Sequence, residues 1–211
     1  MPITAALFDF GGVILSSPFE AFARYERERG LPDGLLRTIN STNADTNAWA
    51  RFERSEVDFD EFCALFESEA RALGHEVAAR EIMPLLAGEV RPAMVEAVRR
   101  CGERLKTACL TNNWVAFDEL ADSGRAPGRD EVLTQFDEVV ESSKVGVRKP
   151  DPRFYEIACD RLGIAPHEAV FLDDLGVNLK PARQLGMTTI KVVDPDDAIA
   201  ELEAVVGFPL R

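Results

Sequence analysis

Residues 4–12 run TAALFDFGG, a short apolar stretch that ends in an aspartate, a phenylalanine and two glycines. Apolar runs of this length, bounded by turn residues, are typical of strands buried on both faces of a parallel sheet. The glycines permit a tight turn and let the backbone approach a ligand closely. The stretch therefore predicts a buried strand that brings Asp9 to the edge of a sheet.

Further apolar runs break off at turn residues in the same way, at positions 107–111, 137–140, 169–172 and 188–193. Helical patterns separate several of these runs. One of them opens at Asp151 with a capping residue followed by a proline, and ends at Gly163. Strands that alternate with helices predict a parallel sheet with helices on its faces.

Polar side chains follow these predicted strands. Asp9 follows the first run, Thr111 ends the second, and the pair Asp173-Asp174 follows a later one. Ligands of such sheets bind beyond the carboxyl ends of the strands. We therefore expect these residues to meet at one edge of the sheet.

Residues 16–89 show helical patterns and no strand pattern. One helix is expected behind Asp58, because Glu61 stands three positions later and phenylalanines recur at helical spacing. We predict a core domain of residues 1–15 and 90–211 and a helical cap domain of residues 16–89. A segment inserted directly after the first turn would lie above the ligand site and could act as a lid.

The composition excludes several classes of protein. The chain has 211 residues, of which 46% are hydrophobic and 29% charged, as in globular proteins. It offers no membrane span and no secretory signal, so we expect a cytoplasmic protein. A net charge of -13 disfavours nucleic acid, and four scattered cysteines indicate neither disulfides nor zinc. No segment specifies an oligomeric state.

Asp9 and its predicted neighbours suit phosphoryl transfer. Asp9 could be a covalent nucleophile or a metal ligand. Thr111 and Asn112 could offer a hydroxyl and backbone N–H groups to phosphate oxygens. Each residue also has a plain interpretation, as a capping aspartate or as the turn that ends a strand.

Two further segments add charge to the same edge. Lys149, between Arg148 and Pro150, could neutralise a phosphate or a nucleophile, or could be a solvated loop cation. Asp173 and Asp174 are adjacent acids after an apolar strand, an arrangement that a bound cation would relieve.

Four segments match, in order, the motifs of the haloacid dehalogenase superfamily: Phe8 to Val13, Leu110 to Asn113, Lys149 to Pro152 and Phe171 to Asp174. The chain resembles phosphatases of this superfamily over nearly its whole length. The closer resemblance, carried by Val140 to Ser143 and Phe171 to Arg183, is to the N-terminal phosphatase-like domain of soluble epoxide hydrolases and to a similar domain fused to some acyl-CoA dehydrogenases.

The resemblance implies a Rossmann-like core of about five parallel strands in the order 5-4-1-2-3, with a helical cap inserted after the first motif. It implies a hydrolase that acts on a small phosphorylated metabolite through an aspartyl-phosphate on Asp9. Mg²⁺ would be held by Asp9, the carbonyl of Gly11 and Asp174, with Asp173 beside the ion or linked to it through water.

The resemblance also assigns the phosphoryl group its partners. Thr111, Gly12 and the backbone of Asn112 would bind it, and Lys149 would balance its charge. Asn178 could buttress the acidic loop or could simply begin a helix.

Gly11 departs from the superfamily pattern. Phosphatases of this superfamily usually carry there a second aspartate, which protonates the leaving group and then activates water. Loss of a positioned acid or base costs about 10² to 10⁴ in rate. The metal site keeps its ligand, because only the backbone carbonyl of this residue is used.

Three interpretations of Gly11 stay open. The first is a phosphatase limited to leaving groups that need little protonation, or one that borrows an acid from the cap or the substrate. The second is a catalytically quiet module that binds phosphate or acts as a scaffold. The third is a metal-independent 2-haloacid dehalogenase, which would not need the acidic pair.

The cap is expected to provide substrate specificity. Trp49, which follows a polar loop together with Arg51 and Phe52, is the candidate contact with the substrate body. Its alternative role is packing in the interior of the cap.

Overall fold

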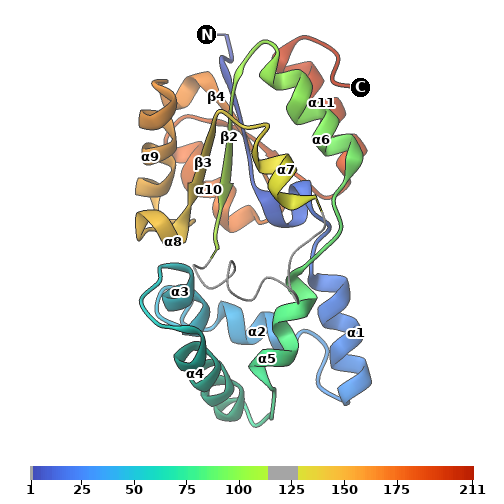
Figure 1. Ribbon diagram of the computed structural model, residues 1–211, viewed down its shortest axis with the longest axis vertical. Helices are drawn as coiled ribbons and strands as arrows, with labels where there is room; N and C mark the ends of the chain where they lie inside the picture. Colours follow the sequence, from blue (N-terminus) through green and yellow to red (C-terminus); the bar gives the residue numbers. More distant parts are fainter. Residues whose placement is uncertain (1, 114–127) are drawn as a thin grey trace.

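The computed structural model describes residues 2–113 and 128–211. Within these ranges, five parallel strands form one sheet in the order β3-β2-β1-β4-β5, which is the predicted order counted from the other edge (Figure 1). Their bounds are Ala5–Phe8 (β1), Lys106–Thr111 (β2), Glu138–Glu141 (β3), Ala169–Asp173 (β4) and Thr188–Lys191 (β5). Each lies within two residues of an expected run.

Side chains of the strands alternate between two hydrophobic clusters, one on each face of the sheet. In β1, Ala6 and Phe8 join the first cluster, whereas Ala5 and Leu7 join the second. Helices α6 (Pro92–Gly102) and α11 (Pro195–Val206) cover the first face, and α9 (Pro152–Leu162) and α10 (Gly176–Gln184) cover the second (Figure 1). The predicted layers, with helices on both faces, are confirmed.

The helix boundaries follow local capping chemistry. Asp151 caps α9 by accepting a hydrogen bond from the Arg153 N–H, and Gly163 ends the helix with a left-handed φ of 62°. Three short elements complete this part of the chain: α7 (Arg129–Leu133), α8 (Ser142–Val145) and η4 (Pro166–Glu168).

The inserted segment is helical, as expected. It contains α1 (Phe19–Arg29), α2 (Leu35–Ser41), α3 (Ala48–Glu53), α4 (Phe59–Ala72), α5 (Ala79–Ile82) and η2 (Met83–Leu86). These helices share a third hydrophobic cluster, and Asp58 and Glu61 form the expected capping box of α4. The division into a core domain and a cap domain at residues 16 and 89 stays a prediction.

The two connections between this segment and the sheet lie side by side. Leu15 and Val90 form an isolated antiparallel bridge, and the Ser16 N–H donates to the Glu89 carbonyl at 2.8 Å. The helical segment therefore leaves and rejoins the rest of the chain at one place, next to the turn that follows Asp9.

Two expectations from composition can be compared with the described residues. None of the helices in this part of the chain is long and apolar enough to cross a membrane. All four cysteines are buried and free, so no disulfide contributes to the fold.

Candidate active site

The carboxylates converge where the strand order reverses. The sequence proceeds from β1 to β2 and β3 on one side, and returns to place β4 on the other side of β1. Such switch points open a crevice at the carboxyl ends of the strands. Asp9 follows β1, and Asp173 ends β4, so a carboxylate oxygen of each, together with one of Asp174, lies within 4.8 Å of the others.

Lys149 lies between two of these carboxylates. Its Nζ is 2.7 Å from Oδ1 of Asp9 and 2.8 Å from Oδ2 of Asp173, and the side chain is 1% exposed. Burial alone would lower the pKa of this ammonium, but Asp173 and Asp9 together raise it above its usual value. The lysine is therefore a fixed positive charge at neutral pH.

Asp9 has one oxygen engaged and one available. Oδ1 accepts from Lys149 and, at 2.7 Å, from the Phe10 N–H, whereas no donor among the described residues reaches Oδ2. Burial raises the pKa of Asp9 to about 8, with Lys149 opposing the rise and the charges of Asp173 and Asp174 adding to it.

Asp173 is held by a dense set of donors. Besides Lys149, it accepts from the Leu175 N–H at 2.8 Å and from the side-chain amide of Asn178, which reaches both oxygens at 3.0 Å. Asn178 is fixed in turn by the hydroxyl of Tyr155, which donates to its carbonyl at 2.7 Å. With both oxygens occupied, Asp173 orients Lys149, and Asn178 buttresses the acidic loop.

Asp174 lies directly against Gly12. A Cβ atom on Gly12 would be 2.3 Å from Oδ2 of Asp174, and Gly12 has a φ of 79°, which L side chains rarely adopt. Burial, followed by the charge of Asp173, raises the pKa of Asp174 to about 6. The glycine is thus required both by its backbone angle and by the carboxylate next to it.

These residues fit a divalent cation. Three carboxylates gather around one lysine, which leaves an excess of negative charge in a largely buried place. Carboxylate and carbonyl oxygens are the ligands that Mg²⁺ prefers. The raised pKa values of Asp9 and Asp174 have the same leading cause, because burial disfavours the charged form of each carboxylate and the neighbouring charge of Asp173 adds to the effect.

Gly11 differs from Gly12. Its φ of -72° and ψ of 129° are ordinary for any residue, and a Cβ built on it has no neighbour within 4 Å. Neither the backbone nor the packing requires a glycine here. The missing acid is therefore a chemical difference from the superfamily pattern rather than a structural necessity.

Thr111 and Asn112 lie at the end of β2, beside the turn after Asp9. The strand pairing that matches Phe8 with Cys109 brings Thr111 to this edge, where it is 6% exposed. The side chain of Asn112 has a function that the sequence did not indicate. Its amide donates to the Lys149 carbonyl at 3.0 Å, and its Oδ1 accepts from the Lys149 N–H at 2.9 Å.

Arg91 is a second neighbour that the sequence did not indicate. Its Nη1 donates to the Gly12 carbonyl at 2.7 Å, and its backbone N–H donates to the Ile14 carbonyl at 2.9 Å. Arg91 is separated from this turn by the whole helical segment, so no local pattern links the two.

Trp49 lies in the third hydrophobic cluster. It is 6% exposed, and its ring centroid is 4.7 Å from that of Phe62. This packing accounts for the residue without a substrate, and its proposed contact with a substrate stays a prediction.

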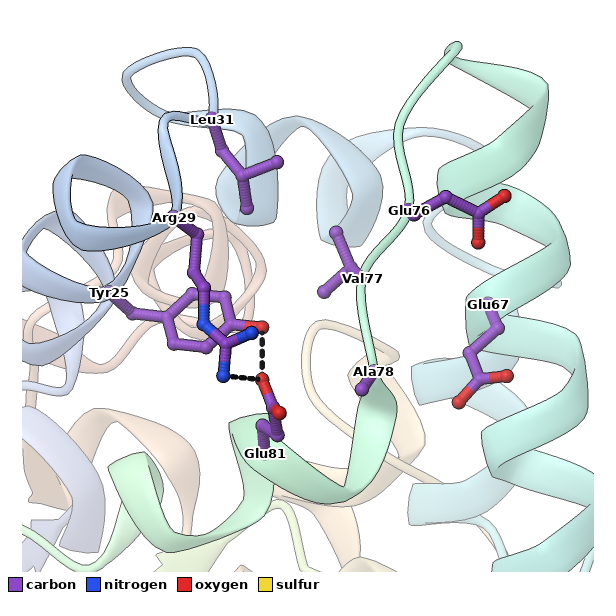
Figure 2. A pocket seen from close by; sticks show the side chains of 8 residues that line it. All are labelled: Tyr25, Arg29, Leu31, Glu67, Glu76, Val77, Ala78 and Glu81. Atoms are coloured by element: carbon purple, nitrogen blue, oxygen red, sulfur yellow. Dashed lines mark hydrogen bonds and ion pairs between the residues drawn. The ribbon is translucent and has the colours of Figure 1, made fainter.

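A cavity of about 370 Å³ opens elsewhere in the helical segment, and no residue of the four motifs lines it. Figure 2 shows Tyr25 and Arg29 on one wall, both bonded to Glu81. Glu67 and Glu76 lie across from them. It is separate from the carboxylates described above.

Comparison with known proteins relates the chain to one family of hydrolases. A sequence model described as haloacid dehalogenase-like hydrolase matches residues 3–186. The chain is 37% identical to acyl-CoA dehydrogenase family member 10 of Mus musculus, over 98% of this chain and 19% of that protein. It is 35% identical to bifunctional epoxide hydrolase 2 of Sus scrofa, over 100% of this chain and 40% of that protein. It therefore spans less than half the length of these two relatives.

Two further proteins match along most of their length. A protein of Mycobacterium tuberculosis named as a phosphatase is 32% identical, over 89% of this chain and 86% of that protein. A haloacid dehalogenase family enzyme of Bacteroides thetaiotaomicron, crystallised with magnesium and inorganic phosphate, superposes with a TM-score of 0.61 at 20% identity, covering 90% of this chain and 93% of that one. The latter comparison supports the fold.

The two glycines allow a matched test of the turn. Gly12→Ala should lower the free energy of unfolding by about 1–2 kcal/mol from its left-handed backbone alone, and by more from the clash with Asp174. Gly11→Ala should be neutral or stabilising by up to about 1 kcal/mol. Chemical denaturation measures the free energy of unfolding of both variants. An equal change in the two would contradict the difference in backbone angle and surroundings between Gly11 and Gly12.

The raised pKa values predict how stability changes with pH. In the metal-free protein, folded Asp9, with a pKa of about 8, holds a proton that the unfolded chain has released. The stability contributed by this proton is lost as the pH rises through about 8. Mg²⁺ compensates the buried negative charge that remains when Asp9 loses its proton, so the stabilising shift in thermal midpoint that Mg²⁺ produces should be larger at about pH 8.5 than at about pH 6.

Thermal scans with and without Mg²⁺ at both pH values test this prediction. Asp9→Asn should lose most of the pH dependence that the metal-free protein shows. A magnesium-induced shift that shrinks as the pH rises would mean that these carboxylates are not the metal site.

Proposed function

The chain belongs to the haloacid dehalogenase-like hydrolases, and from this premise we propose that it is a Mg²⁺-dependent phosphatase of small phosphorylated metabolites with Asp9 as its nucleophile. The observation that carries the proposal is the buried contact of Lys149 with Asp9, next to the carboxylate of Asp174. The relative named as a phosphatase, matched over most of its length, supports hydrolysis of a phosphate ester.

Asp9, the carbonyl of Gly11 and Asp174 are the proposed Mg²⁺ ligands. Asp173 is assigned to the lysine rather than to direct coordination, because its oxygens already accept four hydrogen bonds. When bound, the ion neutralises the phosphate and holds it against the nucleophile. The solved enzyme that contains magnesium and phosphate supports this choice of metal.

The reaction proceeds in two displacements. Oδ2 of Asp9 forms a bond to phosphorus, while the bond from phosphorus to the leaving oxygen breaks and its electron pair leaves with that oxygen. Water then forms a bond to phosphorus as the bond from phosphorus to Oδ2 of Asp9 breaks. The electron pair of that bond returns to the carboxylate, a proton of the water passes to solvent, and inorganic phosphate is released. Lys149 keeps Asp9 oriented throughout and balances the added negative charge.

Thr111 and the backbone N–H of Asn112 are the proposed donors to the transferred phosphoryl group. Gly12 has no side chain, so its backbone can lie close to this group. The helical residues 16–89 are the proposed cap, which would exclude water during transfer. Their single connection beside the Asp9 turn supports this assignment.

The open position of Gly11 limits the substrates. No carboxyl group extends from this residue to protonate the leaving oxygen, so esters whose leaving group is already stable as an anion should react best. Aryl and acyl phosphates have such leaving groups, whereas alkyl phosphates do not.

One alternative shares the same observation. A chain without this acid could bind phosphate without turning it over, as a quiet binding or scaffold module. The acidic pair argues against metal-independent dehalogenation, since that reaction needs no cation site.

The leaving group provides a direct test. With Mg²⁺, kcat/KM for 4-nitrophenyl phosphate or acetyl phosphate should exceed that for glycerol phosphate by at least about 10², the lower range of acid catalysis. Gly11→Asp should narrow this ratio, because the position has room for the side chain. Gly11→Asn, which cannot donate a proton as an acid, is the matched control.

Equal rates for aryl and alkyl esters in the unmodified protein would contradict the role given to Gly11. Binding of beryllium fluoride without turnover of any ester would favour the quiet module.

Removal of the nucleophile should separate chemistry from binding. Asp9→Asn should reduce turnover by at least about 10³, as expected for a group that acts covalently. Magnesium binding, measured by calorimetry, should weaken but persist, because Gly11 and Asp174 remain. Asp160→Asn, an exposed substitution on α9, serves as the control and should retain full activity. Residual turnover near the normal rate would exclude Asp9 as the nucleophile.

A further inference from the structure

A charged pair connects the helical segment to the loop of residues 146–151 between α8 and α9, which carries Lys149 and is called the lysine loop here. Nε of Arg148 lies 2.6 Å from Oε2 of Glu53, at the end of α3, and the two side chains are only 19% and 14% exposed. Arg148 also donates through Nη1 to the carbonyl of Ala44 at 2.9 Å. One guanidinium therefore joins two points of the helical segment to the loop.

A further hydrogen bond joins the helical segment to the rest of the chain near this ion pair. The hydroxyl of Ser55, just beyond α3, donates to the carbonyl of Ser143 in α8 at 3.3 Å. Helices α3 and α8 face each other here, and Figure 1 shows them as neighbours across the two parts of the chain. The helical segment thus contacts the rest of the protein at residues that lead directly into the lysine loop.

Lys149 is next to Arg148 in the sequence, and its backbone is fixed from the opposite side. The Asn112 side chain binds both the N–H and the carbonyl of Lys149. The loop is consequently held between two anchors. Asn112 directly follows strand β2, whereas Glu53 belongs to the helical segment.

The pair differs from an ordinary surface ion pair. Exposed pairs contribute little, because water solvates either partner alone. A guanidinium that is largely withdrawn from water loses much more when its carboxylate leaves. Displacement of the helical segment would take away both contacts of the Arg148 guanidinium, and the loop would lose its anchor on this side.

We propose that Glu53 is a positioning residue of the phosphatase site, which acts through Arg148 so that docking of the helical segment and placement of Lys149 occur together. This inference rests on the function proposed above. It gives the helical segment a part in forming the site, in addition to covering it.

Steady-state kinetics with 4-nitrophenyl phosphate test the proposal. Glu53→Gln keeps the shape and removes the charge, and should lower kcat by about tenfold, within the range produced by a small misplacement of a reacting group. The matched control is Glu56→Gln. Glu56 pairs with Arg54 at 2.6 Å, and Arg54 is 19% exposed like Arg148, but this pair stays within the helical segment.

A double-mutant cycle shows whether Glu53 acts through Arg148. Arg148→Met should lower kcat by a similar factor. The kcat of the double variant should be about equal to that of the less active single variant, because both substitutions remove the same interaction. Losses in kcat that multiply, or an equal loss in Glu56→Gln, would overturn the proposal. A rise in KM alone would also overturn it, since that would indicate substrate contact rather than positioning.

Hydrogen exchange provides a measurement independent of activity. In Glu53→Gln, the amides of α8 and of the loop to Lys149 should exchange at least about threefold faster, while α11 remains unchanged. Unchanged exchange at α8 and the loop would overturn the coupling even if the protein is a phosphatase. Faster exchange in a protein that hydrolyses no phosphate ester would retain the coupling and refute the proposed function.

Discussion

A buried ammonium group organises both the fold and the site. Lys149 lies between Asp9 and Asp173, and burying its ammonium group without these partners would cost several kcal/mol. They are stable together because Nζ is within 2.8 Å of an oxygen of each partner. This contact requires the ends of β1 and β4 and the lysine loop to meet. The charge of Asp174, which has no lysine of its own among the described residues, then makes the same place suitable for a divalent cation.

The two glycines after Asp9 differ in whether the structure requires them. Gly12 is dictated by geometry, since its backbone is left-handed and Asp174 occupies the space of a Cβ. Gly11 has an ordinary backbone and open surroundings. A Gly-Gly pair in a sequence suggests one flexible turn, whereas here one position is structurally required and the other, in the proposed phosphatase, limits which leaving groups can react. In the proposed phosphatase, metal binding and proton transfer are therefore separable in this turn.

Local signals account for the parts of the structure that could be predicted. The apolar runs gave the strands, and Asp151 and Gly163 gave the ends of α9, because these patterns act over a few residues. The motifs indicated which residues would meet. The side chain of Asn112, the reach of Arg91 and the hydroxyl of Tyr155 could not be predicted, because they connect positions 37, 79 and 23 residues apart. Such contacts depend on side-chain directions that only the assembled fold determines.

The lysine loop is where these separate requirements meet. Asn112 fixes its backbone to the sheet, Asp173 fixes its ammonium, and Glu53 holds the preceding arginine from the helical segment. An enzyme with an aspartate at position 11 could tolerate some looseness here, because proton transfer would contribute about 10² to 10⁴ of its rate. In the proposed phosphatase, which lacks that contribution, placement of charge and exclusion of water would supply a larger share of the catalysis. The absence of an acid at Gly11 and the firm hold on the lysine loop are therefore complementary features of one site.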